Sequence, residues 1–271
     1  MKSMKQLKVN EIHNIALEIL KDVADFCEKN HLEYFISCGT LLGAVRHRGF
    51  IPWDHDIDID MPRDSYERFL STYHTDRGYQ IVSAYTHKQA AFSYAKVTYC
   101  NTTRSPDPKQ KSPIGVNIDV FPLDSFVSEE QAKAIYNKIK PVKQLIASYK
   151  KINELPKTRA ALLRFAKNKS LLKFFIRKAD RRIGINQGKK GDFLSVLGAP
   201  TAKEPEIFKR EELFPTKKEG SFEGCVFRIP NNPDRYLTLL YGDYHKLPPM
   251  EQIRSTTLTP IYWVDQKERD I

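Results

Sequence analysis

An acidic run carries the residues that are best suited to do chemistry. Residues 53–60 read Trp-Asp-His-Asp-Ile-Asp-Ile-Asp, so acids alternate with other residues. Strict alternation is typical of a β-strand and predicts four carboxylates on one face, about 7 Å apart: Asp54, Asp56, Asp58 and Asp60. Carboxylates this close raise each other's pKa unless a cation lies between them. The run therefore predicts a site for a hard divalent ion, Mg²⁺ or Mn²⁺, which binds carboxylates together with phosphate oxygens.

Two other structures can contain such a run. A calcium-binding EF-hand loop also opens with Asp-x-Asp-x-Asp, but it needs Gly at its sixth position and Glu at its twelfth. Counted from Asp54, these positions hold Ile59 and Ser65, so the calcium loop is excluded. The alternative that stays open is a solvated edge strand, since edge strands often carry charge.

A third carboxylate is predicted from a later strand. Asp119 lies between β-branched residues in the stretch 116–121. An acid in a buried strand is costly unless it is paired or bound to metal. With Asp56 and Asp58 it would complete a three-carboxylate cluster, the kind that holds two metal ions around a phosphoryl group.

Other residues near the acidic run are suited to bind a phosphorylated substrate. Gly39 and Thr40 fall between a predicted strand and a predicted helix, where backbone N–H groups can face an anion. Arg46 is the expected phosphate contact because its guanidinium forms a planar fork. Lys96 could reach a phosphate from its strand, or equally lie on a solvated strand face.

Aromatic residues could form a cage for a quaternary ammonium group. Trp53 is best placed, because it adjoins the acidic run. Each candidate could instead be a core residue, since aromatic side chains are often buried. The candidates are Trp53, Tyr94, Tyr241, Tyr244 and Trp263.

The elements that must position these residues predict an α+β fold, with a mixed β-sheet core flanked by helices. Helices are expected over 12–27, 41–48 and 63–73, and strands over 33–36, 53–60, 80–84, 92–99 and 116–121, the last ended by Pro122. Two or three basic helices are expected over 129–184, interrupted near Pro156. We expect three parts: a catalytic core (1–128), a basic helical segment (129–190) and a C-terminal part that completes the active-site cleft (191–271).

The formal net charge of +11 is unevenly distributed over the 271 residues. Residues 131–190 contain 18 Lys and Arg but only two acids, Glu154 and Asp180, and so carry +16. The remainder, which includes the acidic run, carries −5. Because the basic character is regional, a nucleic-acid partner for the whole chain is disfavoured.

The basic segment has two explanations. Its apolar and basic residues interleave, as in Leu171-Leu172-Lys173-Phe174-Phe175, and such an amphipathic helix can bind an anionic membrane surface. It can also cover the catalytic sheet with its lysines in solvent, and both can hold at once.

The cysteine spacing and the hydropathy pattern predict a location in the cell. The four cysteines have neither zinc-site spacing nor a CxxC pair, which predicts free thiols in a reducing compartment. No apolar run approaches the length of about 18 residues that a spanning helix needs. We expect a cytoplasmic protein.

The stretch from Ser37 to Asp58 resembles the LicD family, bacterial phosphotransferases of the nucleotidyltransferase superfamily that are related to fukutin and fukutin-related protein. Two further pieces fit the resemblance, Asn117 to Asp124 and Tyr241 to Tyr244 followed by Pro248-Pro249. The resemblance implies a nucleotidyltransferase-like core. It also implies that Asp56 and Asp58 are metal ligands and that Asp119 is a ligand or general base. The zinc-binding insertion of the animal relatives has no counterpart here.

The resemblance further implies the activity: transfer of phosphocholine from CDP-choline to a cell-surface glycan or teichoic-acid precursor, expected to be lipid-linked at the inner face of the membrane. The expected substrate-binding residues are Gly39, Thr40, Arg46, Trp53, Lys96 and Tyr241. One alternative is transfer of phosphoethanolamine, glycerol phosphate or ribitol phosphate from a CDP-linked donor. A second is a nucleic-acid-binding protein with a nucleotidyltransferase-like core.

Overall fold

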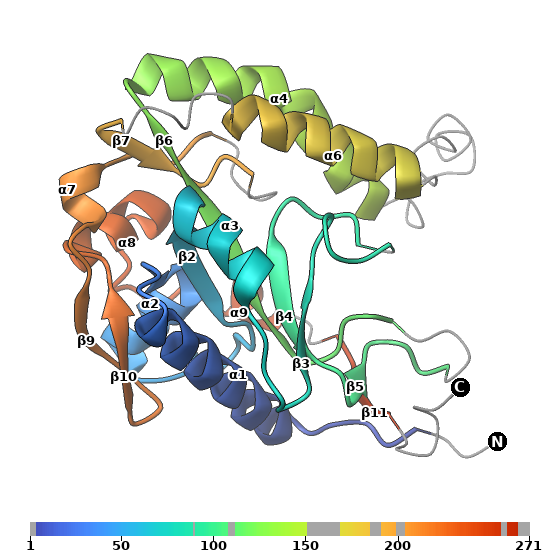
Figure 1. Cartoon of the computed structure of the whole chain (residues 1–271). Helices are drawn as coiled ribbons and strands as arrows, with labels where there is room; N and C mark the ends of the chain where they lie inside the picture. The colour runs from blue at the N-terminus through green and yellow to red at the C-terminus, as the bar shows by residue number, and fades with distance from the viewer. Residues whose placement is uncertain are drawn as a thin grey trace.

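The computed structural model describes residues 4–88, 90–107, 112–150, 169–184, 191–198, 204–255 and 259–264. Helices and strands are both abundant, and the predicted α+β class is confirmed (Figure 1). The described helices are α1 (Val9–Lys29), α2 (Cys38–His47), α3 (Arg63–Thr72), α4 (Glu129–Lys150), α6 (Lys169–Gly184), α7 (Arg210–Leu213), α8 (Pro233–Tyr241) and α9 (Met250–Ser255).

A mixed sheet forms the centre of the molecule. Its order is β1 (Phe35–Ile36), β2 (Asp58–Pro62), β6 (Asn117–Phe126), β4 (Ala95–Tyr99) and β3 (Tyr79–Val82), with β7 (Phe193–Ser195) on β6 and β8 (Phe208–Lys209) on β7. Strands β2 and β6 run parallel, and the other pairs in this sheet are antiparallel. Two small pairs are separate: β9 (Lys217–Phe222) with β10 (Cys225–Ile229), and β5 (Thr102–Thr103) with β11 (Tyr262–Trp263).

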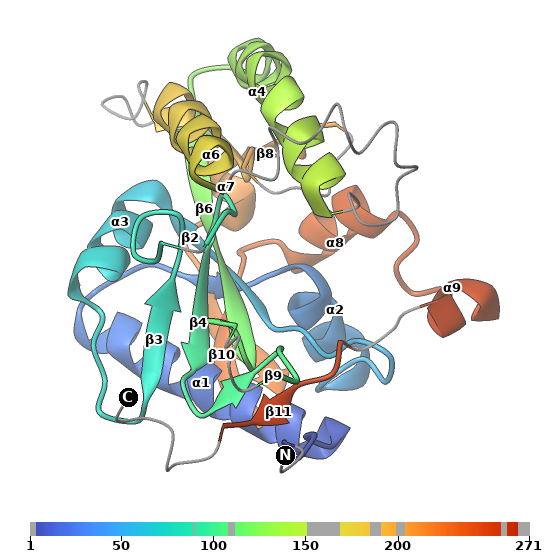
Figure 2. The ribbon, with the colours of Figure 1, turned by 90° about the vertical axis from the view of Figure 1, so that its right-hand side faces the viewer.

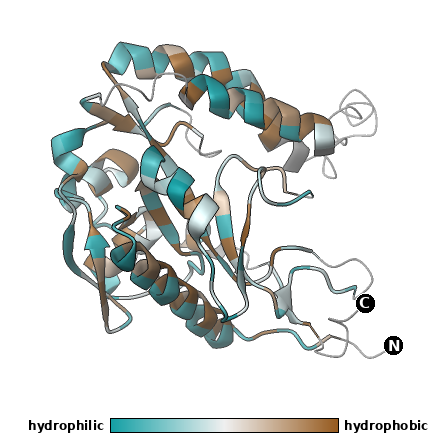
Figure 3. Ribbon diagram, in the orientation of Figure 1, coloured by the Kyte–Doolittle hydropathy of each residue, from teal (hydrophilic) through white to brown (hydrophobic). Residues whose placement is uncertain are grey.

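Helix α1 packs on the sheet through a single apolar face. Ile12, Ala16, Ile19 and Val23 recur every three or four residues and are all buried, which is the periodicity of an amphipathic helix. Hydrophobic and hydrophilic bands therefore alternate along its ribbon (Figure 3). The prediction of a helix over 12–27 is confirmed.

Helices α4 and α6 lie side by side at one end of the sheet, as two views of the ribbon show (Figures 1 and 2). Two small apolar clusters hold them there. One joins α4 to the end of β6 through Ile135 and Phe126, and the other joins α6 to the chain after β3 through Leu172 and Ala84. The inward apolar face of the covering-layer explanation is thus confirmed for the described part of the basic segment. The expectation that its lysines lie in solvent is wrong for Lys143, which is 8% exposed and donates to the Leu197 carbonyl (3.1 Å). The break expected near Pro156 falls in residues 151–168, outside the described residues.

The predicted strand over 53–60 is wrong in its first half. Residues 52–53 form a turn, which the Asp54 N–H closes by donating to the Ile51 carbonyl (2.9 Å), and β2 begins only at Asp58. The partner strand β1 pairs only with Ile59 and Asp60. Residues 54–57 therefore continue the sequence alternation but are not part of the strand.

The prediction that Pro122 ends its strand is also wrong, because β6 continues to Phe126. The Asp119 N–H donates to the Ile57 carbonyl toward β2 (2.8 Å), so the missing N–H of Pro122 would face the other side. There the pairing with β4 ends at Val120. Proline is tolerated where no ladder hydrogen bond is lost.

In the part of the chain that the structure describes, no helix is long and apolar enough to cross a membrane. None of the four cysteines is assigned to a disulfide bond, in agreement with the prediction from their spacing.

Candidate active site

Parallel pairing of β2 and β6 places Asp58 directly opposite Asp119. Apolar residues on either side of each acid, such as Ile57 and Ile118, are fully buried and fix the two strands in this register. Each carboxylate therefore emerges at the same end of its strand. Two predicted ligands that are far apart in the sequence become neighbours.

The carboxylates of this site are close enough to affect one another's ionisation. The pKa of Asp58 lies well above its ordinary value, first because of burial and then because of the negative charges of Asp119, Asp56 and Asp54. Burial also raises the pKa of Asp119, while Lys96 opposes the shift. Asp54, Asp56 and Asp119 are thus all near enough to Asp58 for their charges to raise its pKa.

Besides the neighbouring acids, Asp119 has a lysine and an amide group close to its carboxylate. Lys96, 8% exposed, forms an ion pair with the Asp119 carboxylate and lies 5.0 Å from the centroid of the Tyr94 ring. The Asn117 amide donates to the same carboxylate oxygen (2.7 Å), and Arg104 donates to the Asn117 side-chain carbonyl (3.0 Å). Of the two alternatives for Lys96, the solvated strand face is wrong. Its contact with a phosphate remains a prediction.

The strand–helix turn before the acidic run holds the Asp58 backbone in place. The Asp58 N–H donates to the Thr40 hydroxyl (2.8 Å), and the Asp58 carbonyl accepts from the Ser37 N–H (2.9 Å). Thr40 is only 2% exposed, so in this structure its hydroxyl positions a carboxylate-bearing residue. Its contact with substrate stays a prediction.

Gly39 is required by its close approach to Asp54. A Cβ built on Gly39 would lie 2.4 Å from Asp54 Oδ2, so any larger residue would force the Asp54 carboxylate to move. We therefore predict that Gly39→Ala displaces Asp54 and lowers kcat/KM by about tenfold or more, because small displacements at a reacting centre are costly. The matched control is Gly198→Ala, where the nearest atom would lie at an ordinary 3.4 Å. Steady-state kinetics of both variants test this prediction, and equal losses in the two would contradict it.

An open pocket of about 440 Å³ adjoins the carboxylates. Trp53, Asp54 and Tyr241 contribute to its wall, and α2 contributes Gly39 and Arg46. The other lining residues are Leu42, Ile51, Asp243, Tyr244, Lys246, Leu247 and Pro248. The C-terminal segment thus supplies one wall of the pocket, and five predicted residues meet around this space: Gly39, Arg46, Trp53, Tyr241 and Tyr244.

Arg46 connects the two sides of this pocket. Its guanidinium donates to the Tyr244 carbonyl at 2.7 Å and to the Lys246 carbonyl at 3.4 Å. The expected phosphate contact would therefore come from a group that also holds the C-terminal wall.

The aromatic residues that were candidates for a quaternary-ammonium cage lie in three different places. Tyr94 lies with Lys96 beside Asp119, whereas Trp53, Tyr241 and Tyr244 line the pocket. Trp263 is on β11, packs edge-on against Tyr99 at 6.5 Å, and is not part of the pocket wall.

Asp60 does not share the open site with the other acids of the run. It is 1% exposed and accepts a hydrogen bond from the Tyr236 hydroxyl (3.1 Å), and burial raises its pKa to about 7. Tyr236 is on α8, and no sequence signal near the run points to it. Asn117 and Arg104 were also missed, although the Asn-x-Asp spacing places Asn117 on the same strand face as Asp119.

The residues present fit a hard divalent cation by their chemistry. Within the described residues, no group of three or more His, Cys, Asp or Glu side chains is already arranged to hold a metal ion. The donors are nevertheless of the right type, because carboxylates that destabilise one another's charge are stabilised by a cation. Asp56, Asp58 and Asp119 are the residues that would hold it.

Paired acidic strand ends, a helix start and an adjoining pocket define a site of the phosphotransferase class. The chain belongs to the LicD family: residues 31–158 match the family model described as LicD/FKTN/FKRP, nucleotidyltransferase domain. It is 30% identical over 263 residues to the lipopolysaccharide cholinephosphotransferase LicD of Haemophilus influenzae. This alignment covers 92% of the chain and 95% of the Haemophilus protein.

The chain is also similar, over shorter stretches, to two uncharacterized rickettsial proteins. One, from Rickettsia typhi, is 39% identical over 67 residues, 24% of this chain and 22% of that protein. The other, from Rickettsia prowazekii, is 52% identical over 42 residues, 16% of each chain. The resemblance to the LicD family is confirmed.

Proposed function

We propose that this protein transfers phosphocholine from CDP-choline to a hydroxyl group of a cell-surface glycan or teichoic-acid precursor. The observation that carries the proposal is the pairing of Asp58 with Asp119 beside a pocket walled by Trp53 and Tyr241. The carboxylates suit a metal-bound diphosphate, and aromatic faces suit a quaternary ammonium group. The cholinephosphotransferase activity named for the Haemophilus relative supports the same choice of group.

The carboxylates are proposed to act with Mg²⁺, or with Mn²⁺ in its place. Asp56, Asp58 and Asp119 would hold the ion, which when bound neutralises charge on phosphate oxygens. Lys96 adds a fixed positive charge beside Asp119. Thr40 and Ser37 keep the Asp58 backbone in register while the substrate binds.

In the proposed reaction, a hydroxyl oxygen of the acceptor attacks the phosphorus that carries choline. A new P–O bond forms, the bond from that phosphorus to the bridging oxygen of the diphosphate breaks, and CMP leaves with that oxygen. Asp119 accepts the hydroxyl proton as general base. Lys96 and Asn117 hold its Oδ1 in place for this role.

The acceptor and the place of action are also proposals. A lipid-linked precursor at the inner face of the membrane would be reached from the cytoplasm. The basic segment would then lie near the anionic surface of that membrane.

Removal of the metal should abolish the transfer. We expect no CMP release from CDP-choline in EDTA, and recovery when Mg²⁺ or Mn²⁺ is added in excess, because the carboxylate cluster then loses and regains its cation. The measurement is CMP formed with CDP-choline, CDP-ethanolamine, CDP-glycerol or CDP-ribitol, in the presence of a purified acceptor glycan.

Each result of this experiment has a distinct meaning. If the protein prefers another CDP-linked donor, the group that it transfers is that donor's group and not phosphocholine. Release of inorganic diphosphate would show attack at the nucleoside phosphorus and contradict the proposed chemistry. Full activity in EDTA would contradict the proposed requirement for a metal ion. Binding of RNA without turnover of any donor would favour the nucleic-acid alternative.

A further inference from the structure

Helix α6 has two faces with different tasks. Leu172, Ile176 and Ile183 are at most 2% exposed and pack on the protein. At 100° per residue these positions cluster on one side of the helix, and the exposed positions fall on the other side. The exposed set is Ser170, Leu171, Phe174, Lys178, Arg181 and Arg182. We call these six residues the outer face of α6.

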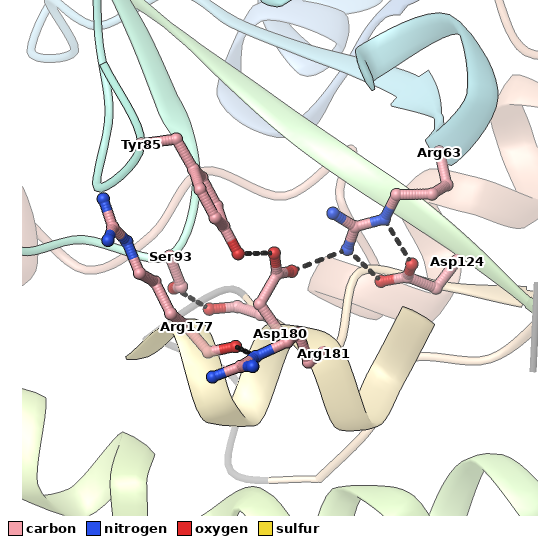
Figure 4. A network of polar contacts seen from close by, with 8 residues as sticks. Arg63, Tyr85, Ser93, Asp124, Arg177, Asp180 and Arg181 are labelled. Atoms are coloured by element: carbon pink, nitrogen blue, oxygen red, sulfur yellow. Dashed lines mark hydrogen bonds and ion pairs between the residues drawn. The ribbon is translucent and has the colours of Figure 1, made fainter. Parts of the chain in front are cut away.

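Some charged residues of α6 lie beside its buried face and bond to the rest of the protein. Lys173 donates to the His87 carbonyl (2.7 Å), and Arg177 donates to the Ala84 carbonyl (2.8 Å). Asp180, the only acid of the helix, points inward to Arg63 (3.0 Å) and accepts from the Tyr85 hydroxyl (Figure 4). These three side chains are therefore turned away from the outer face. Arg181 lies at its edge, because it is exposed but also lines a pocket with Tyr85 and Asp180.

The outer face combines apolar and positive side chains. Phe174 is 51% exposed and Leu171 is 36% exposed, a large apolar surface to leave in water on a helix that already packs well on its other side. Lys178, Arg181 and Arg182 follow on the next turns of the same face. Since Asp180 faces inward, this face carries three cations and no acid.

We propose that the outer face of α6 docks on an anionic phospholipid bilayer. Anionic headgroups attract cations that lie at the level of the lipid phosphates, and an aromatic ring one turn away can enter the boundary of the acyl chains. A nucleic acid would match the cations but would offer the exposed ring of Phe174 no acyl chains to enter. The bilayer matches both halves of the face.

This docking would leave the active site free. Asp124, which bonds to Arg63 beside α6, lies five residues beyond Asp119 on β6, or about 17 Å at the rise of a β-strand. The acidic site and α6 therefore belong to opposite ends of the same strand. An acceptor whose glycan projects from the bilayer could reach the carboxylates while α6 stays on the lipid.

Flotation with vesicles tests the proposal without any donor or acceptor, so its outcome is independent of the proposed function. We expect binding to vesicles of phosphatidylglycerol and phosphatidylcholine in equal parts, and little binding to phosphatidylcholine alone. The triple variant Lys178→Glu, Arg181→Glu, Arg182→Glu should bind about a hundredfold more weakly, and Phe174→Ser about tenfold. The Phe174→Trp variant should show a blue-shifted emission only with the anionic vesicles.

A matched control keeps the total change in charge the same. Lys29→Glu, Lys209→Glu and Lys217→Glu together alter three exposed lysines on α1, β8 and β9, and should bind the vesicles far better than the α6 variant. Circular dichroism melting would establish that all variants are folded. Equal losses in the two triple variants, an unshifted emission from the Phe174→Trp variant, or binding to RNA but not to anionic vesicles would each overturn the proposal.

Discussion

Replacing Asp58 with asparagine should lower kcat/KM for phosphotransfer by about a thousandfold or more, an effect of roughly 4 kcal/mol on the barrier. Asp58 faces Asp119 across the two parallel strands and lies among the predicted metal ligands. Asparagine keeps the shape of the side chain and its backbone contact with Thr40, but it removes the negative charge that would hold the cation. The measurement is CMP release under saturating Mg²⁺.

The same substitution should stabilise the metal-free protein. The pKa of Asp58 is raised on folding, so the folded state binds more protons than the unfolded state, and stability falls as the pH rises through this range. Conversely, metal-free protein should gain stability as the pH falls from the raised pKa toward the ordinary value of 3.8. Removing the charge should raise the melting temperature at neutral pH and flatten this dependence.

The control for both effects is Asp64→Asn, which alters an exposed acid on α3. It should retain full activity and the wild-type pH dependence of stability. An active Asp58→Asn protein would refute the assignment of the site. A folded, inactive variant with an unchanged melting temperature would leave the site intact and contradict the repulsion between the carboxylates.

Replacing Arg63 with alanine should have the largest effect on stability, about 3–5 kcal/mol in the free energy of unfolding. Arg63 is 5% exposed and makes two hydrogen bonds to the fully buried Asp124, at 2.8 and 3.0 Å. It also pairs with Asp180 of α6 at 3.0 Å (Figure 4). Alanine would leave two carboxylates together with no arginine between them, in a place that water enters poorly.

Urea unfolding measures this loss, and a surface pair provides the comparison. Arg235 and Glu212 form an ion pair at 3.1 Å in which the arginine side chain is 45% exposed, so Arg235→Ala should cost less than about 1 kcal/mol. Because Arg63 joins α3, β6 and α6, its loss should also expose α6 to limited proteolysis. Equal costs for the two variants would mean that burial of the Arg63 network contributes nothing to stability.

Local patterns in the sequence were enough to predict several elements. The apolar spacing over 12–27 predicted α1, and the stretch 63–73 closely matches α3. Both predictions depend only on side chains within a few turns of one another. They failed where pairing with distant strands decides the outcome, as at the start of β2 and at Pro122 within β6.

For the site, the pattern of residues was enough to identify those that carry the charge: Asp56, Asp58 and Asp119, with a Gly-Thr turn before them. Residue type and alternation are local properties, so one sequence reveals them. Which of these groups meet depends on how the chain folds. The tertiary structure placed Asp58 against Asp119, brought Arg104 and Tyr236 to the same strands, and removed Asp60 from the open site. The register of paired strands and the burial of each side chain depend on segments far apart in the chain, and these cause the pKa shifts that distinguish one aspartate from the next.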